Sequence, residues 1–263
     1  MNIRKDQKQL SRILGAVLVG LVAAFVIIGI FYTPYDPNEM NSALKNAAPT
    51  FSHPFGTDNF GRDILSRVMT GAKTTFFVAI TTIIIGGGIG TFIGALTGYY
   101  GGLLDEVLMR INDGLTSFPS ILLALIFVSV VGAGKYNVIL ALGIIFVPSF
   151  ARVIRSEFIQ YKEMDFVKNA KLMGAGDFRI MFVHILPNTR PILLSSLTIG
   201  FNNAVLAEAG MSYLQLGVQP PDASLGRMLS EAQSFLFNAP WYALAPGFMI
   251  VVTVLGFSLI NES

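Results

Sequence analysis

The sequence has no cysteine and little charge. Of its 263 residues, 13% are charged and 53% are hydrophobic. Without cysteine, disulfides, zinc–thiolate sites and thiol nucleophiles are all excluded. In soluble domains about a quarter of the residues are charged. The much lower fraction here means that a large part of this protein's surface must face something other than water. The formal net charge of +2 is too small to indicate nucleic-acid binding.

Histidine is also scarce, and a nucleotide-binding motif is incomplete. His53 and His184 are the two histidines and they are far apart in the sequence; with no cysteine and no histidine pair, the usual metal-ligand cluster is missing. Gly132–Lys135 resembles the end of a phosphate-binding loop, but that motif requires glycine where Ser129 stands and Ser or Thr where Tyr136 stands. We therefore expect no metal, cofactor or ATP on this chain and no catalytic residue.

Long apolar runs are abundant. In lipid every backbone donor and acceptor has to be satisfied within its own segment, so apolar runs of about 20 residues are expected to be helices that cross about 30 Å of hydrocarbon. Hydropathy predicts about six such helices and an all-α integral membrane fold. They are Ile13–Tyr32, a span within Lys73–Asp105, a span from near Asn112 to near Gly132, a short span at about Asn137–Ala151 that contains Pro148, Pro191–Leu216, and a span within Ser234–Ile260.

The placement of Lys and Arg predicts the orientation, because cytoplasmic loops next to spans are enriched in both. The segment 152–190, between the fourth and fifth spans, is basic, and so is the N-terminal tail. The basic residues of the tail are Arg4, Lys5, Lys8 and Arg12. We expect both termini in the cytoplasm and an uncleaved first span, with a signal anchor as the alternative. The long outer loop 33–73 fits less well, since it contains Lys45, Arg62, Arg67 and Lys73.

Glycine recurs every fourth residue in the second predicted span. Gly86, Gly90, Gly94 and Gly98 therefore line one face of a helix. Glycine allows another helix to approach closely, and close packing drives helix association in lipid. The stripe predicts a tight contact within the bundle, or alternatively a subunit interface or pore-lining face.

The segment 152–190 is nearly forty residues long, and connections of that length are usually functional. Met164–Met173 has the spacing of an amphipathic helix, and Gly174 suits the end of that helix. A second short helix is expected at Asp177–Leu186, with Asp177 as its N-cap. Two prolines then break the chain before the fifth span, Pro187 and Pro191. Physical reasoning alone leaves two roles open for this helix pair, lying on the anionic inner leaflet or docking on a partner.

Three motifs resemble a known family. Ala170–Asn188, AKLMGAGDFRIMFVHILPN, resembles the cytoplasmic EAA loop of ABC importer permeases, including Gly174 and the Ile-Leu-Pro ending. His53–Arg67 and Glu208–Pro221 are similar to segments of the dipeptide, oligopeptide and nickel subfamily, and most of all to its second, C-type permease. One departure is Lys168, which stands where the family has an acidic residue, so any ion pair of that residue is in doubt.

The resemblance implies a permease subunit of an ATP-binding-cassette importer in the bacterial cytoplasmic membrane, which is not itself an enzyme. It implies alternating access, a homologous second permease, two ATP-binding subunits that hold ATP and magnesium, and an extracytoplasmic solute-binding protein. The expected substrate is a di- or oligopeptide, with nickel or another metal chelate as the alternative. The implied ATPase-coupling residues are Met164, Asp165, Phe166, Val167, Ala170, Lys171, Gly174, Ala175 and Phe178.

Polar residues in the predicted fifth span are candidates for a translocation path or gate. Glu208 is the sharpest of them, because ionisable groups within spans are costly and tend to face a cavity or a partner. Asn202 and Asn203 lie on the same span. The alternatives are, for Glu208, a local hydrogen bond or a helix-end carboxylate that reaches the outer membrane–water interface, and, for the asparagines, hydrogen bonds between helices.

The chain is divided here into 1–73, comprising the tail, the first span and the outer loop, and a core permease domain 74–263. The C-terminus stops soon after the last span at Asn261–Ser263, which is consistent with truncation. A self-sufficient channel or secondary carrier is the alternative from another class, but such a protein would not need a coupling loop. An intramembrane protease is a third class, and the sequence shows no His-Glu zinc motif or paired intramembrane aspartates in its support.

Overall fold

The computed structural model describes residues 2–261, with side chains for 9–261. Outside the described residues lie the side chains of Arg4, Lys5 and Lys8 and the C-terminal residues Glu262 and Ser263. The described part of the chain consists of helices and loops, and its one β feature is an isolated bridge between Thr57 and Asp63. The predicted all-α fold is confirmed.

Five helical stretches are long and apolar enough to cross a membrane. They are residues Gln9–Phe31 of α1 (Asn2–Phe31), α2 (Ile64–Tyr100), α5 (Lys135–Tyr161), the continuous stretch Asp177–Tyr213 that ends in α8 (Arg190–Tyr213), and α10 (Pro240–Asn261). A sixth candidate exists if α3 (Gly102–Thr116) and α4 (Ser120–Val131), bent by 84°, are counted as one broken span. The prediction of about six spans agrees with this range.

The third predicted span is not one continuous helix, because a break divides it. The stretch from Asn112 to Gly132 contains the end of α3, the bend and the whole of α4. Pro119 lies at the break, where it lacks a backbone donor and disfavours helical geometry at Phe118 before it. At about 1.5 Å per residue, α4 alone is shorter than the roughly 30 Å hydrocarbon layer.

The fourth predicted span ends too early. Helix α5 continues ten residues past Ala151, to Tyr161, and Pro148 lies inside it without ending it. The extension is stabilised by burial of Ile154 and Phe158, which are four residues apart and therefore on one helix face. Sequence reasoning assigned this stretch to the loop because its charges obscured that spacing.

The second and fifth predicted spans also begin later than the helices do. Helix α2 begins at Ile64, so the preceding loop covers 32–63 and not 33–73. Pro187 and Pro191 do not break the chain before α8. A short α-helix, α7 (Asp177–Arg179), a π-helix (Ile180–Ile185) and a 3-10 helix (Leu186–Thr189) continue directly into α8, since altered hydrogen-bond spacing accommodates a missing donor.

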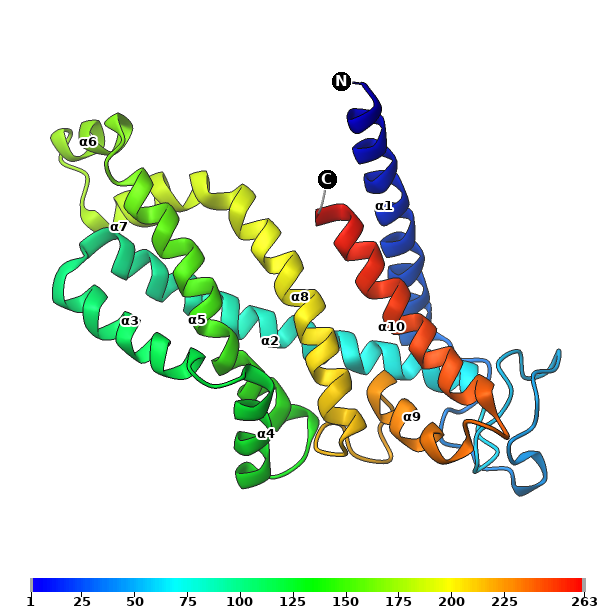
Figure 1. Cartoon of the computed structure of the whole chain (residues 1–263). Coiled ribbons are helices and arrows are strands. Elements are labelled where there is room, and N and C mark those ends of the chain that lie inside the picture. Colours follow the sequence, from blue (N-terminus) through cyan, green and yellow to red (C-terminus); the bar gives the residue numbers. More distant parts are fainter. Residues whose placement is uncertain (1, 262–263) are drawn as a thin grey trace. The chain divides into compact units, whose positions relative to one another are not determined.

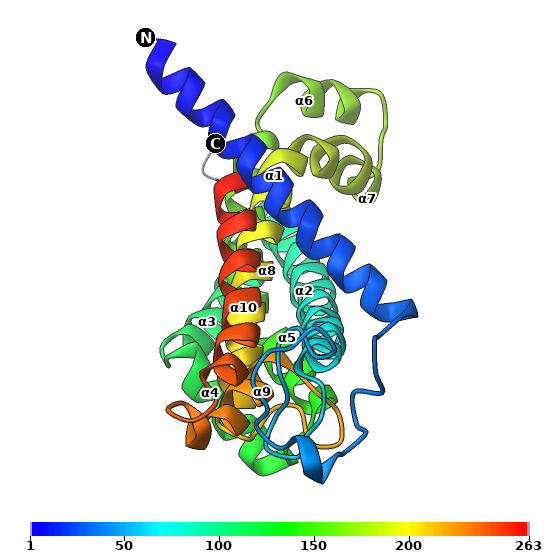
Figure 2. The ribbon, with the colours of Figure 1, turned by 90° about the vertical axis from the view of Figure 1, so that its right-hand side faces the viewer.

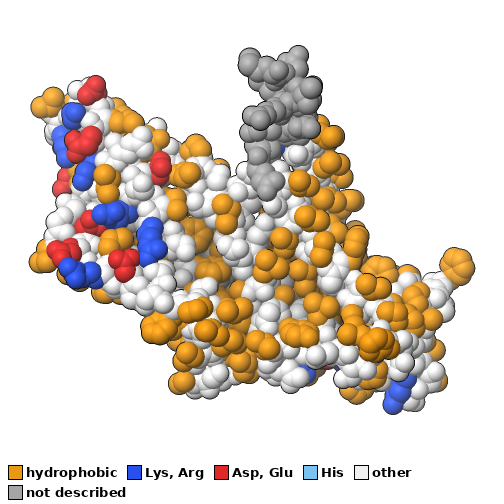
Figure 3. Space-filling view, in the orientation of Figure 1, with side chains coloured by type: hydrophobic (Ala, Val, Ile, Leu, Met, Phe, Trp, Pro, Cys, Tyr) orange, Lys and Arg blue, Asp and Glu red, His pale blue; other side chains and the backbone are white. Residues whose placement is uncertain are grey.

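The described residues form two compact units. Unit 1 comprises Met1–Ile80, Val128–Ile139 and Phe201–Ser263. In it α1 runs beside α10 (Figures 1 and 2), and the short helix α9 (Leu225–Ala232) packs with them around a core that includes Val26, Val68, Met228 and Tyr242. One face of α10 is apolar and exposed, with hydrophobic side chains over it in Figure 3. Its largest exposed members are Leu244, Phe248, Val251 and Leu255.

Unit 2 comprises Thr81–Phe127 and Leu140–Gly200. It contains most of α2, α4 and α5, the whole of α3, and α6 (Asp165–Leu172) with α7. Its core cluster includes Ala95, Ile154, Phe158 and Ile180. In this unit Lys, Arg, Asp and Glu gather over α3, α6 and α7 (Figure 3). The division at residue 73 stays a prediction.

Candidate functional site

Helices α6 and α7 form a hairpin around a glycine turn in unit 2. The N–H of Ala175 donates to the Ala170 carbonyl at 3.0 Å, and the N–H of Gly174 donates to the Lys171 carbonyl at 3.0 Å. This pair of bonds is the Schellman motif, which satisfies the last carbonyls of a helix. Gly174 has φ of +80°, a left-handed conformation that glycine adopts without strain. The predicted first helix and its glycine stop therefore agree with the structure.

Two of the predicted coupling residues face inward. Val167 and Ala170 are buried, and they belong to the same cluster as Ile154 and Phe158 of α5 and Ile180 after α7. Because Val167 and Ala170 are three residues apart, they occupy one side of α6. They hold the hairpin against the end of α5 and are not available to a partner.

The opposite side of the hairpin is exposed and partly apolar. Phe178 is 70% exposed, and Phe166 is also exposed. Leu172 and Met173 are 86% and 88% exposed, and sequence reasoning did not include them among the coupling residues. The available signal was that apolar residues lie on both sides of α6, more than burial of one face requires. An exposed apolar patch of this kind, beside charged side chains (Figure 3), is typical of an interaction site.

The polar residues of the hairpin differ in their roles. Asp177 is not the N-cap of α7, since Gly176 occupies that position without a side-chain bond. The Asp177 carboxylate instead accepts a hydrogen bond from the Tyr99 hydroxyl of α2 at 2.6 Å. Lys168 lies 3.8 Å from Asp165 Oδ1, and both side chains are largely exposed. Such a pair contributes little to stability, so Lys168 remains available to a partner.

The glycine stripe of α2 lies against α5. A Cβ added at Gly86, Gly90, Gly94 or Gly98 would lie 2.5–2.8 Å from an atom of α5. Real Cβ atoms do not approach other atoms this closely, so the two backbones can meet only because these side chains are missing. Within unit 2 the stripe makes a tight contact inside the bundle.

Two ion pairs attach α3 to α5. The Arg155 guanidinium makes a two-bond contact with the Asp105 carboxylate, at 2.5 and 2.6 Å. Arg152 lies 2.8 Å from Asp113. Both arginines lie in the segment 152–190 that the sequence predicts to be a basic loop. The structure shows that both are helical and paired. A two-bond contact such as that of Arg155 with Asp105 also fixes the relative orientation of the two side chains.

The three candidate path residues of α8 do not share a face. The Asn202 amide donates to the Val254 carbonyl of α10 at 3.3 Å, so it links two helices. Asn203 is exposed. Glu208 is completely buried, and its Oε1 accepts a hydrogen bond from the Ser212 hydroxyl at 2.6 Å. Within unit 1 these residues form no common polar surface, and a role in the path stays a prediction.

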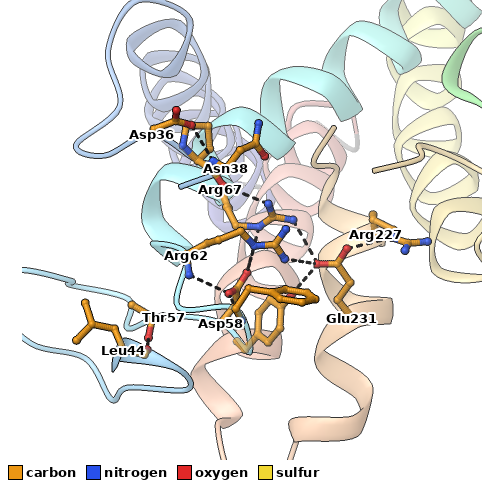
Figure 4. A network of polar contacts seen from close by, with 12 residues as sticks. Asp36, Asn38, Leu44, Thr57, Asp58, Arg62, Arg67, Arg227 and Glu231 are labelled. Atoms are coloured by element: carbon orange, nitrogen blue, oxygen red, sulfur yellow. Dashed lines mark hydrogen bonds and ion pairs between the residues drawn. The ribbon is translucent and has the colours of Figure 1, made fainter. Parts of the chain in front are cut away.

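A buried charge network joins the 32–63 loop to three helices of unit 1 (Figure 4). Glu231 of α9 accepts bonds from Arg62 at 3.0 Å and Arg67 at 3.3 Å. It also accepts from Arg227 at 3.1 Å and from the Tyr242 hydroxyl at 2.8 Å. Arg62 and Arg67 are two of the four basic residues that fit poorly in an outer loop. They are buried and paired, so they do not form a basic surface.

The network also explains the His53–Arg67 motif. Asp58 lies 2.6 Å from Arg62 Nε and 3.5 Å from Arg67 Nε. His53 Nδ1 lies 2.9 Å from Asp63 Oδ1. The ionisable residues of this motif therefore pair with one another or with Glu231. Burial by itself would raise the pKa of Glu231, but Arg67, the Tyr242 hydroxyl, Arg62 and Arg227 together hold that pKa below its ordinary value.

The two histidines and the phosphate-loop-like segment are the remaining chemical candidates. His53 and His184 belong to different units, and residues 2–261 contain no group of three or more His, Asp or Glu side chains placed to hold a metal ion. Lys135, at the end of the phosphate-loop-like segment, lies 2.5 Å from Asp222.

Comparison with known proteins places the chain among transport proteins. Residues 90–262 match the family model described as "Binding-protein-dependent transport system inner membrane component". The chain is 39% identical to the Dipeptide transport system permease protein DppC of Alkalihalophilus pseudofirmus, over 98% of this chain and 86% of that protein. It is 34% identical to DppC of Haemophilus influenzae, over 95% and 87%. It is 38% identical to the Glutathione transport system permease protein GsiD of Escherichia coli O6:K15:H31, over 98% and 86%.

A solved structure has a similar fold. It is described as inward facing conformations of the MetNI methionine ABC transporter, and it superimposes with a TM-score of 0.57 at 18% sequence identity. The match covers 76% of this chain and 93% of that chain. At that identity the likeness concerns the fold alone.

Proposed function

The chain belongs to the family of binding-protein-dependent transport system inner membrane components, and we propose that it forms half of the pore of an ATP-driven importer of di- or oligopeptides. It is a multi-pass membrane permease and, like its relatives, not an enzyme. Dipeptide and glutathione permeases among the relatives favour peptides over the nickel-chelate alternative. The observation that carries the mechanism is the α6–α7 hairpin, with a buried underside and an exposed apolar face.

The proposed assembly contains a homologous second permease, two ATP-binding subunits and an extracytoplasmic solute-binding protein. ATP and magnesium would be held by the ATP-binding subunits, and this chain would bind no cofactor. The proposed location is the bacterial cytoplasmic membrane, with both termini and the α6–α7 hairpin on the cytoplasmic side.

The hairpin is suited to transmit movement from an ATPase. Its exposed residues Phe178, Leu172 and Met173 would be buried on docking, which supplies about 25 cal/mol for each Å² of apolar surface removed from water. Its underside is packed through Val167 and Ala170 against α5. Packed interiors transmit displacement, so a movement of the docked face would carry α5 with it. This movement would switch the pore between opening to the outside and opening to the cytoplasm.

The test of this function is uptake by cells with and without the gene, supplied in parallel with a labelled dipeptide, labelled glutathione and a labelled nickel chelate. We expect loss of peptide uptake and unchanged nickel uptake in the deleted strain. Loss of nickel uptake alone would reject the peptide assignment. Restoration of peptide uptake by the gene on a plasmid is the control for effects on neighbouring genes.

Replacing Gly174 by valine should uncouple transport without unfolding the bundle. Nothing lies within 4 Å of a Cβ at this position, so the substitution acts through its φ of +80° alone. A β-branched residue in that conformation costs about 1–3 kcal/mol, and the strain would displace the turn between α6 and α7. Because the turn has open space around it and can shift to relieve the strain, we expect ATP-driven uptake to fall at least about fivefold, while the thermal unfolding midpoint of the detergent-solubilised protein falls only slightly.

Gly176→Val is the matched control for Gly174→Val. Gly176 lies in the same turn and also has open space around it, but its φ of −72° and ψ of 155° suit valine. Uptake by this variant should remain near that of the wild type. Equal uptake by the two variants would contradict the coupling role of the turn.

A further inference from the structure

The C-terminal end of α2 touches both arms of the α6–α7 hairpin through one side chain. Tyr99, the penultimate residue of α2, is 8% exposed and belongs to the same apolar cluster as Ala95 and Phe158. Its hydroxyl donates a hydrogen bond to Asp177 Oδ1 at 2.6 Å. Asp177 is the first residue of α7 and stands 78 positions away in the sequence.

The other arm of the hairpin meets the face of the same ring. Lys171 Nζ, in the last turn of α6, lies 5.1 Å from the centroid of the Tyr99 ring. A cation at this distance from an aromatic face is attracted by the electrons of the ring. Tyr99 therefore contacts the residues three positions to either side of Gly174, one through its ring and one through its hydroxyl.

These contacts differ in kind from the packing under α6. Apolar contacts such as those of Val167 transmit displacement but are non-directional, so they do not fix one orientation of the hairpin. A hydrogen bond to a carboxylate is short and weakens steeply with angle, so it fixes one position of α7 relative to α2. The glycine stripe in turn places α2 directly against α5.

We propose that Tyr99 is a positioning residue that ties the coupling hairpin to α2, so that movement of the hairpin is delivered to α2 as well as to α5. The inference rests on the proposed function and extends it by assigning a second transmission contact. It predicts that the Tyr99 hydroxyl determines how much peptide is imported for each ATP hydrolysed.

The test uses the complete transporter, reconstituted in liposomes with its partner subunits and peptide-loaded binding protein. Tyr99→Phe removes the hydroxyl and keeps the ring over which Lys171 lies. We expect the ratio of dipeptide imported to ATP hydrolysed to fall at least about tenfold, the effect of losing one hydrogen bond to a charged group. A merely structural defect would lower import and hydrolysis in proportion and leave the ratio unchanged, and that result would overturn the inference.

Tyr100→Phe is the matched control, because Tyr100 is the next residue, is 53% exposed, and has no hydrogen-bond partner for its hydroxyl among the described residues. Asp177→Asn keeps an oxygen acceptor, so its ratio of dipeptide imported to ATP hydrolysed should stay close to that of the wild type. Asp177→Ala should lower this ratio as much as Tyr99→Phe does. The double variant Tyr99→Phe, Asp177→Ala should be no worse than either single one. Additive losses would overturn the inference.

The two hypotheses fail in distinguishable ways. A wild-type complex that hydrolyses ATP but imports no peptide would overturn the proposed function, and the inference with it. A wild-type complex that imports peptide, together with a Tyr99→Phe complex of unchanged ratio, would overturn the inference alone.

Discussion

Replacing Glu231 by glutamine is expected to destabilise the protein by about 3 kcal/mol, because breaking a buried ion pair from one side leaves uncompensated charge. Glu231 accepts bonds from three arginines and a tyrosine hydroxyl. Arg67 is only 1% exposed, and after the substitution Asp58 would be the carboxylate left to Arg62 and Arg67. The measurement is the thermal unfolding midpoint of the detergent-solubilised protein, together with the amount of folded protein recovered.

Glu106→Gln is the control for Glu231→Gln. Glu106 pairs with Arg110 at 2.7 Å over the same four-residue spacing that separates Arg227 and Glu231, but both members of the Glu106–Arg110 pair are largely exposed. Exposed pairs contribute about 0–1 kcal/mol, so this variant should unfold close to the wild type. Equal midpoints for the two variants would mean that the network does not stabilise unit 1.

The pH dependence of the same variant gives an independent check. The folded-state pKa of Glu231 lies below its ordinary value of 4.5. Its stabilisation is therefore fully present above about pH 4.5 and is lost as the pH falls through the lowered pKa. We expect the difference in unfolding midpoint between the wild type and Glu231→Gln to be constant from neutral pH to about 5 and to shrink below it. A difference in unfolding midpoint that grew as the pH fell would contradict the lowered pKa of Glu231.

Gly94→Ala is expected to be the most destabilising glycine-to-alanine substitution in unit 2. The added Cβ would lie 2.5 Å from the Ala151 carbonyl oxygen and 3.0 Å from the Arg155 amide nitrogen. Both are backbone atoms of α5, so neither can rotate away and the helices have to separate. Overpacking of this kind costs about 1–3 kcal/mol. We expect a lower unfolding midpoint and a comparable fall in peptide uptake.

Gly88→Ala is the matched control, because Gly88 lies in the same helix and nothing approaches within 4 Å of a Cβ there. Alanine is favoured over glycine in a helix by about 1 kcal/mol, so this variant should be as stable as the wild type or more so. If Gly94→Ala behaved like Gly88→Ala, the close approach of α2 and α5 would be contradicted.

Much of the fold was predictable because it depends on local properties of the chain. The length of an apolar run determines which segments can cross lipid as helices with their backbone hydrogen bonds made. The spacing of Val167 and Ala170 determines which side of α6 is buried. The turn at Gly174 followed from glycine's access to positive φ. Errors occurred where a boundary depends on a contact elsewhere, as at the end of α5, which continues past Ala151 because Ile154 and Phe158 find a core.

The sequence by itself determined that this is a helical membrane protein, which residues form the coupling hairpin, and that the glycine stripe of α2 needs a close neighbour. Only the tertiary structure decided that the neighbour is α5, that Tyr99 meets Asp177, and that Arg62 pairs with Glu231, 169 positions away. The reason is physical. Helix formation and burial in lipid depend on residues close together in the chain, whereas ion pairs and close packing depend on which distant segments meet, and neither segment's pattern specifies the other.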